Sequence, residues 1–297
     1  MDYSRLPTEK QNPKTRALDT LSVEKILSLI DREDRRVPEA VRKVNPAIRR
    51  AVALIVHSLK KGGRLFFVGA GTSGRLGVLE AAECPPTFNT PPSLVQAVMA
   101  GGRRAVFRSQ EGAEDRSPES RRIVAKRVRK GDVVVGITAS GVTPFVKGAL
   151  SEAKRRGART VLIACNFLSP LRSRADVLIA PRTGPEVITG STRLKAATAT
   201  KLILNRITVA SMVRLGKVYG NRMVDLEPRS KKLRARALGI LKNFTGLSDG
   251  KAKRIFKKAR GRVKAAILMA RKSIAYGEAV RRLKKTGGFL GEALSLR

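Results

Sequence analysis

A glycine-rich stretch with two hydroxyl side chains follows the first strongly apolar run of the chain. Residues 69–74 read GAGTSG and lead into a helical pattern. They match the G-x-G-x-x-G fingerprint of dinucleotide-binding folds, but that site also needs an acidic residue after the second strand, where residues 99–102 read MAGG. The stretch therefore favours a phosphate site built from backbone N–H groups, Thr72 and Ser73. A tight strand-to-helix turn is the alternative.

A second hydroxyl-rich stretch has the same relation to a later apolar run. Residues 138–144 read TASGVTP and also open a helical pattern. The hydroxyls of Thr138, Ser140 and Thr143, together with the helix dipole, can surround a dianionic phosphate monoester without any Lys. Simple N-capping by Ser140 or Thr143 is the alternative, because it needs only one of the three hydroxyls.

Five short apolar runs must position these two stretches. They are LFFVG at 65, LVQAVMA at 94, DVVVGI at 132, TVLIAC at 160 and DVLIA at 176. Runs that are apolar on both faces and alternate with helical stretches are typical of a parallel sheet built by βαβ crossovers. Both hydroxyl-rich stretches then lie at the carboxyl ends of strands, where ligands bind in such sheets.

The sequence on either side of the predicted sheet is helical. Residues 1–20 are polar and contain Pro7 and Pro13, which predicts an extended arm without packing. Ser22 precedes a first helical run, and a second helical run extends from Pro38 to about Ile55. A long helix is predicted over 192–214, and two or three basic amphipathic helices after the linker around Pro228. The predicted domains are 1–55 (arm and helices), 56–220 (α/β domain) and 221–297 (linker and helical subdomain).

The strongest compositional feature is positive charge. Lys and Arg number 62 against 23 Asp and Glu, a formal net charge of +39, and residues 229–297 alone hold 21 basic and 3 acidic residues. Such charge attracts polyanions. Single-strand nucleic-acid modules also carry aromatic side chains for stacking, whereas this chain has no Trp and three Tyr. Nucleic-acid binding is therefore compatible with the charge but not favoured over a general basic bias.

The remaining reactive residue types predict no further chemistry. Cys84 and Cys165 are too few for a disulfide framework, and no signal-peptide pattern or run of about 18 apolar residues occurs, which predicts a cytoplasmic protein. Cys84 has no evident histidine partner and is expected to be a buried thiol. His57, the sole histidine, is expected on a partly buried helix face. No His, Cys or carboxylate spacing suggests a metal site.

The two hydroxyl-rich stretches resemble the sugar isomerase (SIS) fold, in which such hydroxyls hold the phosphate of a phosphosugar. Longer stretches resemble the N-acetylmuramic acid 6-phosphate etherase family, in matching order over about residues 20 to 295. They are FVGAGTSGRLGVLEAAECPPTF, EGAED at 111, VVVGITASGVTP, EVITGSTRLKAATATKLILN and KVYGNRMVDL. The resemblance implies an α/β fold, an SIS-type three-layer parallel sheet with an N-terminal helical lead-in and a small C-terminal helical subdomain. It also implies a homodimer and cofactor-free cleavage of a lactyl ether in cell-wall amino sugar recycling.

The resemblance also implies two catalytic glutamates. The family's acid falls on Glu83, which protonates the departing ether oxygen, and its second glutamate falls on Glu114, to which we assign removal of the C2 proton. β-Elimination needs such an acid and base, and water then adds to give N-acetylglucosamine 6-phosphate and D-lactate. Glu111 and Asp115 compete with Glu114 for the role of base. Thr72, Ser73, Thr138, Ser140 and Thr143 are implied to bind the phosphate.

Three residues depart from the family pattern. Val142 stands where relatives commonly carry Arg, Ala197 where they carry Gly, and Thr286 where they carry His. A non-catalytic phosphosugar-sensing SIS regulator is the alternative function, although both glutamates are retained and no helix-turn-helix is recognisable. An isomerase or epimerase of another phosphosugar would use the same phosphate site without losing lactate.

Overall fold

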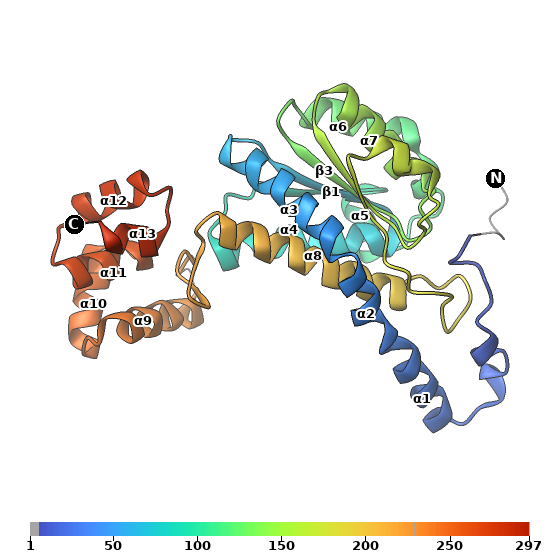
Figure 1. The fold of residues 1–297 in the computed structure, drawn as a ribbon, viewed down its shortest axis with the longest axis horizontal. Helices are drawn as coiled ribbons and strands as arrows, with labels where there is room; N and C mark the ends of the chain where they lie inside the picture. The colour runs from blue at the N-terminus through green and yellow to red at the C-terminus, as the bar shows by residue number, and fades with distance from the viewer. Residues whose placement is uncertain (1–5, 229, 297) are drawn as a thin grey trace. The chain divides into compact units, whose positions relative to one another are not determined.

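A five-stranded parallel sheet lies at the centre of this computed structural model, which describes residues 6–228 and 230–296 (Figure 1). Its strands are β1 (Leu65–Gly69), β2 (Val95–Met99), β3 (Val133–Ile137), β4 (Arg159–Ile163) and β5 (Val177–Ile179). The order is β2-β1-β3-β4-β5. All four strand pairs are parallel, with Leu65 opposite both Val95 and Val133. The structure confirms the five predicted strands and the α/β fold class.

Helices precede, connect and follow the strands. Those from the N-terminus to the end of the sheet region are α1 (Val23–Asp34), α2 (Arg36–Lys43), α3 (Asn45–Lys60), α4 (Gly71–Phe88), α5 (Gly102–Phe107), α6 (Ser117–Arg127), α7 (Pro144–Arg155) and α8 (Lys195–Arg214). Short 3-10 turns lie at Pro13–Thr15, Leu18–Thr20, Ala113–Asp115 and Pro170–Arg174. The predicted long helix is therefore α8, which begins three residues later than expected.

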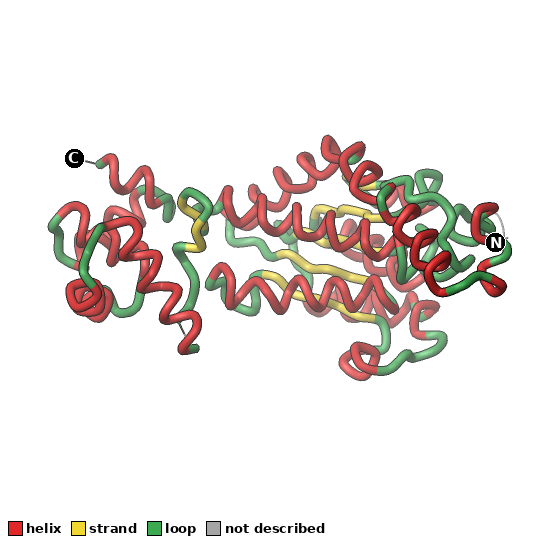
Figure 2. The backbone as a smooth tube through the Cα atoms, turned by 90° about the horizontal axis from the view of Figure 1, so that it is seen from below, coloured by secondary structure: helices red, strands yellow, loops and turns green. Residues whose placement is uncertain are grey.

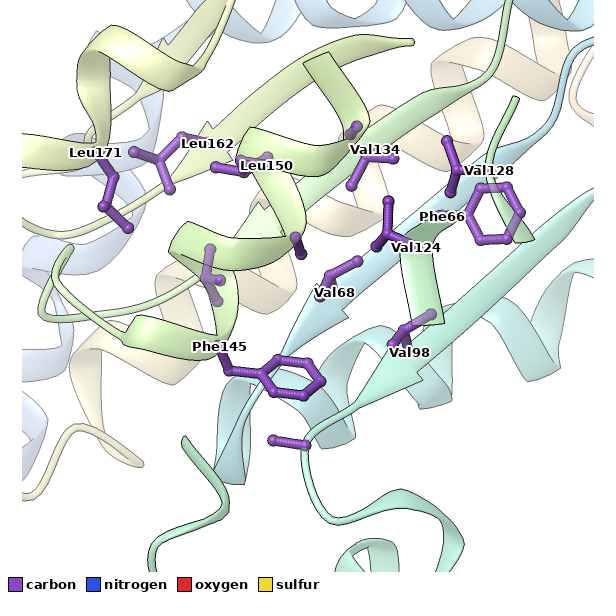
Figure 3. Packing of buried hydrophobic residues seen from close by; sticks show 14 of the residues in the cluster. Phe66, Val68, Val98, Val124, Val128, Val134, Phe145, Leu150, Leu162 and Leu171 are labelled. Carbon is purple, nitrogen blue, oxygen red and sulfur yellow. The ribbon is translucent and has the colours of Figure 1, made fainter. Parts of the chain in front are cut away.

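Both faces of the sheet are covered by helices. Phe66 and Val68 of β1 point to the face covered by α6 and α7, where they pack against Val124 and Phe145 (Figure 3). On the other face, α4 approaches so closely that a Cβ on Gly77 would lie 2.9 Å from Cβ of Phe67. Figure 1 places α3 and α8 on this second side, and Figure 2 shows long helices in front of the strands there. Covering of both faces explains why the strands are largely apolar on both sides.

The N-terminal region differs from the prediction in two ways. Residues 6–20 are not an extended arm, because the side chains of Leu6, Thr8, Asn12 and Thr15 are all buried. The second helical run is two helices, α2 and α3, which meet at Val44 because Pro46 cannot donate a backbone hydrogen bond in the first turn of α3. Ser22 caps α1 as expected, accepting a hydrogen bond from the backbone N–H of Lys25 at 3.4 Å.

The chain divides into two compact units. The first comprises residues up to Ala82 with Ser93–Thr208, and the second comprises Glu83–Pro92 with the residues from Val209 onward. The domain boundaries predicted at 55/56 and 220/221 stay predictions. Among the described residues, no helix is long and apolar enough to cross a membrane.

The second unit has its own core. It holds a small antiparallel pair, β6 (Val218–Tyr219) and β7 (Arg222–Met223). Within residues 230–296, five helices follow, more than the two or three predicted: α9 (Lys231–Thr245), α10 (Asp249–Lys258), α11 (Val263–Lys272), α12 (Tyr276–Lys285) and α13 (Leu290–Ser295). Left-handed residues at Gly246 and Ser273 end α9 and α11, which divides the apolar pattern into shorter helices. Leu241, Ile267 and Ala279 are fully buried in this core.

A buried ion pair fixes the start of α8 in the first unit. The ammonium of Lys195, completely buried, contacts the carboxylate of Glu33, which is 2% exposed. Burial alone raises the pKa of Glu33, but the hydrogen bond and charge of Lys195, with Arg36 and Asn12, bring that pKa below its ordinary value.

Glu186 caps the same helix by accepting from the backbone N–H groups of Lys195 at 3.0 Å and Ala196 at 2.9 Å. Burial raises the pKa of Glu186, and these bonds offset only part of the rise.

Replacing Lys195 with Met should destabilise the protein strongly, because it leaves the Glu33 carboxylate buried without its partner. We expect the unfolding free energy in urea at pH 7 to fall by about 3 to 5 kcal/mol, and a second change, Glu33→Gln, to recover part of the loss. Because the pKa of Glu33 is lowered in the folded protein, its ionised carboxylate stabilises the fold above about pH 4.5, and this stabilisation is lost as the pH falls further. The difference in unfolding free energy between Lys195→Met and the parent should therefore shrink in acid. Lys126→Met, on the exposed side of α6, is the matched control. Equal effects of the two Lys→Met changes would contradict a stabilising pair.

Candidate active site

The strand order reverses between β1 and β3. The chain leaves β1 through α4 toward β2, and leaves β3 through α7 toward β4 on the other side. Because α4 and α7 cover opposite faces of the sheet, a crevice opens between the loops that follow these two strands. The two hydroxyl-rich stretches of the sequence are these loops, so the structure brings them together as predicted.

A cavity of about 270 Å³ lies at this crevice. Its polar lining residues come from four parts of the first unit: Thr72, Ser73 and Arg75; Ser109, Gln110, Glu111 and Glu114; Thr138, Ser140 and Thr143; and Glu9 and Thr192. The cavity thus contains all five hydroxyl residues that the sequence assigned to phosphate binding. It also contains one of the two predicted catalytic glutamates.

The loop after β3 is held in one conformation by its own hydroxyls. Thr138 Oγ1 lies 2.7 Å from Thr143 Oγ1 and 3.3 Å from Ser140 Oγ, and it accepts a hydrogen bond from the N–H of Gly141. Thr143, at the N-cap position of α7, makes no capping hydrogen bond with its side chain. Simple capping by Thr143 therefore does not explain the loop. The three hydroxyls have three protons and make two contacts with one another, so one of the three keeps a proton for a ligand.

Two side chains from the loop after β4 support that arrangement from behind. Ser169 Oγ donates to the carbonyl of Gly141, and Asn166 Nδ2 donates to the carbonyl of Ser140 at 3.0 Å. Gly141 has a φ of +77°, and a Cβ there would lie 2.7 Å from Cβ of Ser169. Only glycine fits this position, because any side chain would meet Ser169 in a backbone conformation that is already unfavourable for it.

The loop after β1 combines a tight turn with exposed donors. A Cβ on Gly74 would lie 2.7 Å from the carbonyl oxygen of Gly69, so these glycines allow the strand and the first turn of α4 to touch. The turn interpretation is therefore correct for the glycines. Thr72 and Ser73 line the cavity, and their hydroxyls make no hydrogen bond to the described residues, which leaves them available to a ligand. Arg75 adds a guanidinium whose Nε donates to the carbonyl of Val106 at 3.0 Å.

The acidic residues divide into those inside and those outside the cavity. Glu111 and Glu114 line it, whereas Asp115 is not among the lining residues. Ser109 Oγ donates to Glu111 at 2.9 Å, while Glu114 sits on the short 3-10 turn Ala113–Asp115 with an exposed side chain. Glu83 is exposed on α4 and does not line the cavity. Glu83 belongs to the second unit and the cavity to the first, so the joint action of the two predicted catalytic glutamates stays a prediction.

Sequence reasoning missed five polar residues of the cavity, which are Glu9, Arg75, Ser109, Gln110 and Thr192. Glu9 was assigned to an arm without packing. The pair Asn12-Pro13 was an available indication of structure there, since Asn at an N-cap followed by Pro opens a helical turn. Asn12 does cap the turn Pro13–Thr15, accepting from the N–H of Lys14 at 3.1 Å.

The other candidate reactive groups lie apart from this chemistry. Cys84 is buried, as predicted. Burial raises the pKa of the Cys165 thiol to about 12, although a hydrogen bond with Thr183 acts to lower that pKa. Cys165 is therefore not a thiolate at neutral pH. His57 is exposed, not partly buried as expected. It lies two residues after the fully buried Ile55, which places its side chain on the opposite side of α3. Among the described residues, no group of three or more His, Cys, Asp or Glu side chains is placed to hold a metal ion.

A parallel sheet whose strand order reverses at a crevice, with two hydroxyl-rich loops at helix starts, defines an α/β protein of the sugar isomerase (SIS) type. In agreement, residues 116–207 match the SIS domain family, and residues 47–154 match the glucokinase regulatory protein N-terminal SIS domain. A solved phosphoheptose isomerase from Francisella tularensis covers 63% of this chain and 98% of its own at 20% identity, with a TM-score of 0.50, a likeness that shows the fold alone.

The full chain has much closer relatives. An N-acetylmuramic acid 6-phosphate etherase from Geobacillus thermodenitrificans is 49% identical over 97% of this chain and 98% of its own length. One from Picosynechococcus is 48% identical over 97% and 96%, and one from Symbiobacterium thermophilum is 50% identical over 90% and 89%. The chain belongs to the N-acetylmuramic acid 6-phosphate etherase family.

The three departures from the family pattern lie in different elements. Val142, in the loop after β3, buries its side chain, and its backbone N–H donates weakly to Ser140 Oγ at 3.4 Å. Ala197 lies in the first turn of α8. Thr286 ends α12 in the second unit, where its hydroxyl donates to the carbonyl of Arg282 at 3.1 Å. Thr286 therefore has a local structural partner of its own.

Thr143→Val should weaken phosphosugar binding while preserving shape, because it removes a hydroxyl donor from the cavity. A lost hydrogen bond to a charged group corresponds to roughly 10- to 100-fold in affinity. Isothermal titration with glucosamine 6-phosphate, compared with unphosphorylated glucosamine, measures the phosphate contribution directly. Thr198→Val is the control, since Thr198 is exposed on α8 and bonds only the carbonyl of Leu194. Unchanged phosphosugar affinity in Thr143→Val would remove this loop from phosphate recognition.

Proposed function

We propose that this chain cleaves the lactyl ether of N-acetylmuramic acid 6-phosphate, giving N-acetylglucosamine 6-phosphate and D-lactate. The observation that carries the proposal is that five hydroxyl residues and the Glu114 carboxylate line one cavity, at the point where the strand order reverses. Membership of the etherase family supports it. The reaction serves the recycling of cell-wall amino sugars. We place it in the cytoplasm, in keeping with two cysteines that form no disulfide.

The charges of the cavity give the substrate one orientation. The phosphate is attracted to the helix starts and hydroxyls of the loops after β1 and β3, and repelled by the carboxylates of Glu9, Glu111 and Glu114. The neutral sugar carbons therefore lie toward the carboxylates. In this orientation we assign Glu114 as the base, with Glu111 next to it already accepting a hydrogen bond from Ser109.

The proposed chemistry is elimination followed by hydration. Glu114 removes the C2 proton of the open-chain aldehyde, the C–H electrons form a C2–C3 double bond, and the C3–O bond to lactate breaks. Glu83 donates a proton to the departing oxygen. Water then adds across the double bond, placing its hydroxyl on C3 and a proton on C2. Acid and base roles for two carboxyl groups require that one be protonated while the other is ionised.

We further propose that the protein acts as a homodimer in which Glu83 serves the cavity of a second copy. Glu83 is exposed on α4 and is not among the residues that line the cavity. Leu79, one turn earlier on the same helix face, is 42% exposed. A second copy of the chain packed on this face would cover Leu79 together with Glu83.

Purified protein should release D-lactate from N-acetylmuramic acid 6-phosphate without added metal or nucleotide. Glu83→Gln and Glu114→Gln should each lower kcat by at least about 100-fold, the scale of general acid–base catalysis. Glu114→Gln should also suppress exchange of the C2 proton in heavy water. Asp115→Asn is the matched control, because Asp115 neighbours Glu114 in the chain but does not line the cavity. Binding of the phosphosugar without lactate release would favour a sensor instead.

Mixing the two inactive variants tests the shared site. In a heterodimer of Glu83→Gln with Glu114→Gln, one cavity receives an intact Glu114 from its own chain and an intact Glu83 from the other. We expect co-expression to restore about a quarter of the parent activity, as random pairing makes half of the dimers mixed and each mixed dimer has one intact site. No recovery in a confirmed mixed dimer would assign both glutamates to one chain.

A further inference from the structure

The N-terminal strap, residues 6–20, is fastened to the loop that precedes α8. Thr15 Oγ1 donates to the carbonyl of Val187 at 2.8 Å, and the N–H of Gly190 donates to the carbonyl of Thr8 at 3.2 Å. Asn12 Nδ2 reaches the carbonyl of Pro185 at 3.5 Å. With Thr8, Asn12 and Thr15 buried, these bonds are shielded from water, so the strap is a fixed part of the first unit.

This fastening brings one carboxylate to the cavity. Glu9 lines it together with Gly190 and Thr192. Gly190 has a φ of +77°, and a Cβ at that position would lie 3.0 Å from Oε2 of Glu9. The other carboxylate oxygen accepts a hydrogen bond from Thr8 Oγ1 at 3.1 Å. The strap and a glycine turn thus hold the carboxylate at the cavity wall, and Oε2 has no hydrogen bond to the described residues.

We propose that Glu9 is a specificity-determining residue that accepts a hydrogen bond from a neutral donor of the sugar, either a hydroxyl or the acetamido N–H. An ionised carboxylate has only acceptor sites, so it binds O–H and N–H groups and repels phosphate and lactyl carboxylate. This inference rests on the proposed function for the identity of the sugar. It adds a contact from a segment far in sequence from the loops that bind the phosphate.

Glu9 reaches the cavity from a different part of the fold than Glu111 and Glu114. Those two come from the connection between β2 and β3, whereas Glu9 reaches the cavity with the loop that leads into α8. Asn12, three residues after Glu9, lowers the pKa of Glu33 through a hydrogen bond, and Glu33 pairs with Lys195 at the start of α8. The strap is thereby anchored to the ion pair that fixes α8. Glu9 is positioned by the fold and not by a free chain end.

The test compares three ligands on Glu9→Gln, Glu9→Ala and the parent by isothermal titration. The ligands are N-acetylglucosamine 6-phosphate, glucose 6-phosphate and inorganic phosphate. Both variants should bind N-acetylglucosamine 6-phosphate about 10-fold more weakly or worse, while inorganic phosphate should bind equally or more tightly because a repelling charge is gone. A loss confined to the acetylated sugar identifies the amide N–H as the donor, and a loss for both sugars identifies a donor that both carry, at C2 or on another ring carbon. Glu24→Gln, which removes one exposed charge from α1, is the matched control.

Two results would overturn the proposal. Unchanged affinity for both sugar phosphates would remove Glu9 from recognition, and equal weakening for all three ligands would mean that Glu9 only maintains the strap. Urea unfolding of each variant separates loss of folding from loss of contact. These binding results do not depend on turnover, so absence of lactate release from the parent would contradict the proposed reaction while leaving the role of Glu9 to be decided by titration.

Discussion

The pairing of β1 with β3 is the constraint on which the site depends. The two strands run in register from Leu65 opposite Val133 to Gly69 opposite Ile137, so they end side by side, about 4.8 Å apart. Their residues are buried on both faces, which prevents a shift in register without exposing apolar side chains. The loops that follow must therefore begin together and then separate, since their helices cover opposite faces. A preformed crevice results from the sheet alone.

The cavity itself carries little of the large positive charge of the chain. Arg75 is the only cationic residue among those that line the cavity, while the hydroxyls and the starts of α4 and α7 supply neutral donors. The loop after β3 is fixed by Thr138 within it and by Ser169 and Asn166 behind it, so its donors need little rearrangement when an anion arrives. Fixed donors avoid the free-energy cost of ordering flexible Lys side chains.

The sequence predicted the sheet and the phosphate loops because their signals are local. An apolar run such as residues 133–137 and a hydroxyl-rich loop directly after it lie within a dozen residues. The strap could not be predicted in this way, because its partners at Val187 and Gly190 lie more than 170 residues away in the sequence. Its polar composition and two prolines also resemble a disordered chain end. The five helices of the second unit were undercounted for a different reason: Gly246 and Ser273 interrupt an amphipathic pattern that continues on both sides. The place of Glu83 could not be predicted, since helical spacing locates it on α4 but not relative to a cavity.

Three carboxylates in a cavity proposed to bind a dianion would repel it if they surrounded the phosphate, so the origin of each carboxylate matters. Glu9, Glu111 and Glu114 come from the strap and from the connection after β2, whereas the hydroxyl donors come from the ends of β1 and β3. In the proposed function, the phosphosugar is oriented by attraction to the hydroxyl donors and repulsion by the carboxylates. The net charge of +39 acts earlier, by raising the local concentration of an anionic substrate around the protein. In the proposed function, long-range charge favours encounter, and the short-range arrangement of neutral donors and carboxylates decides which carbon faces Glu114.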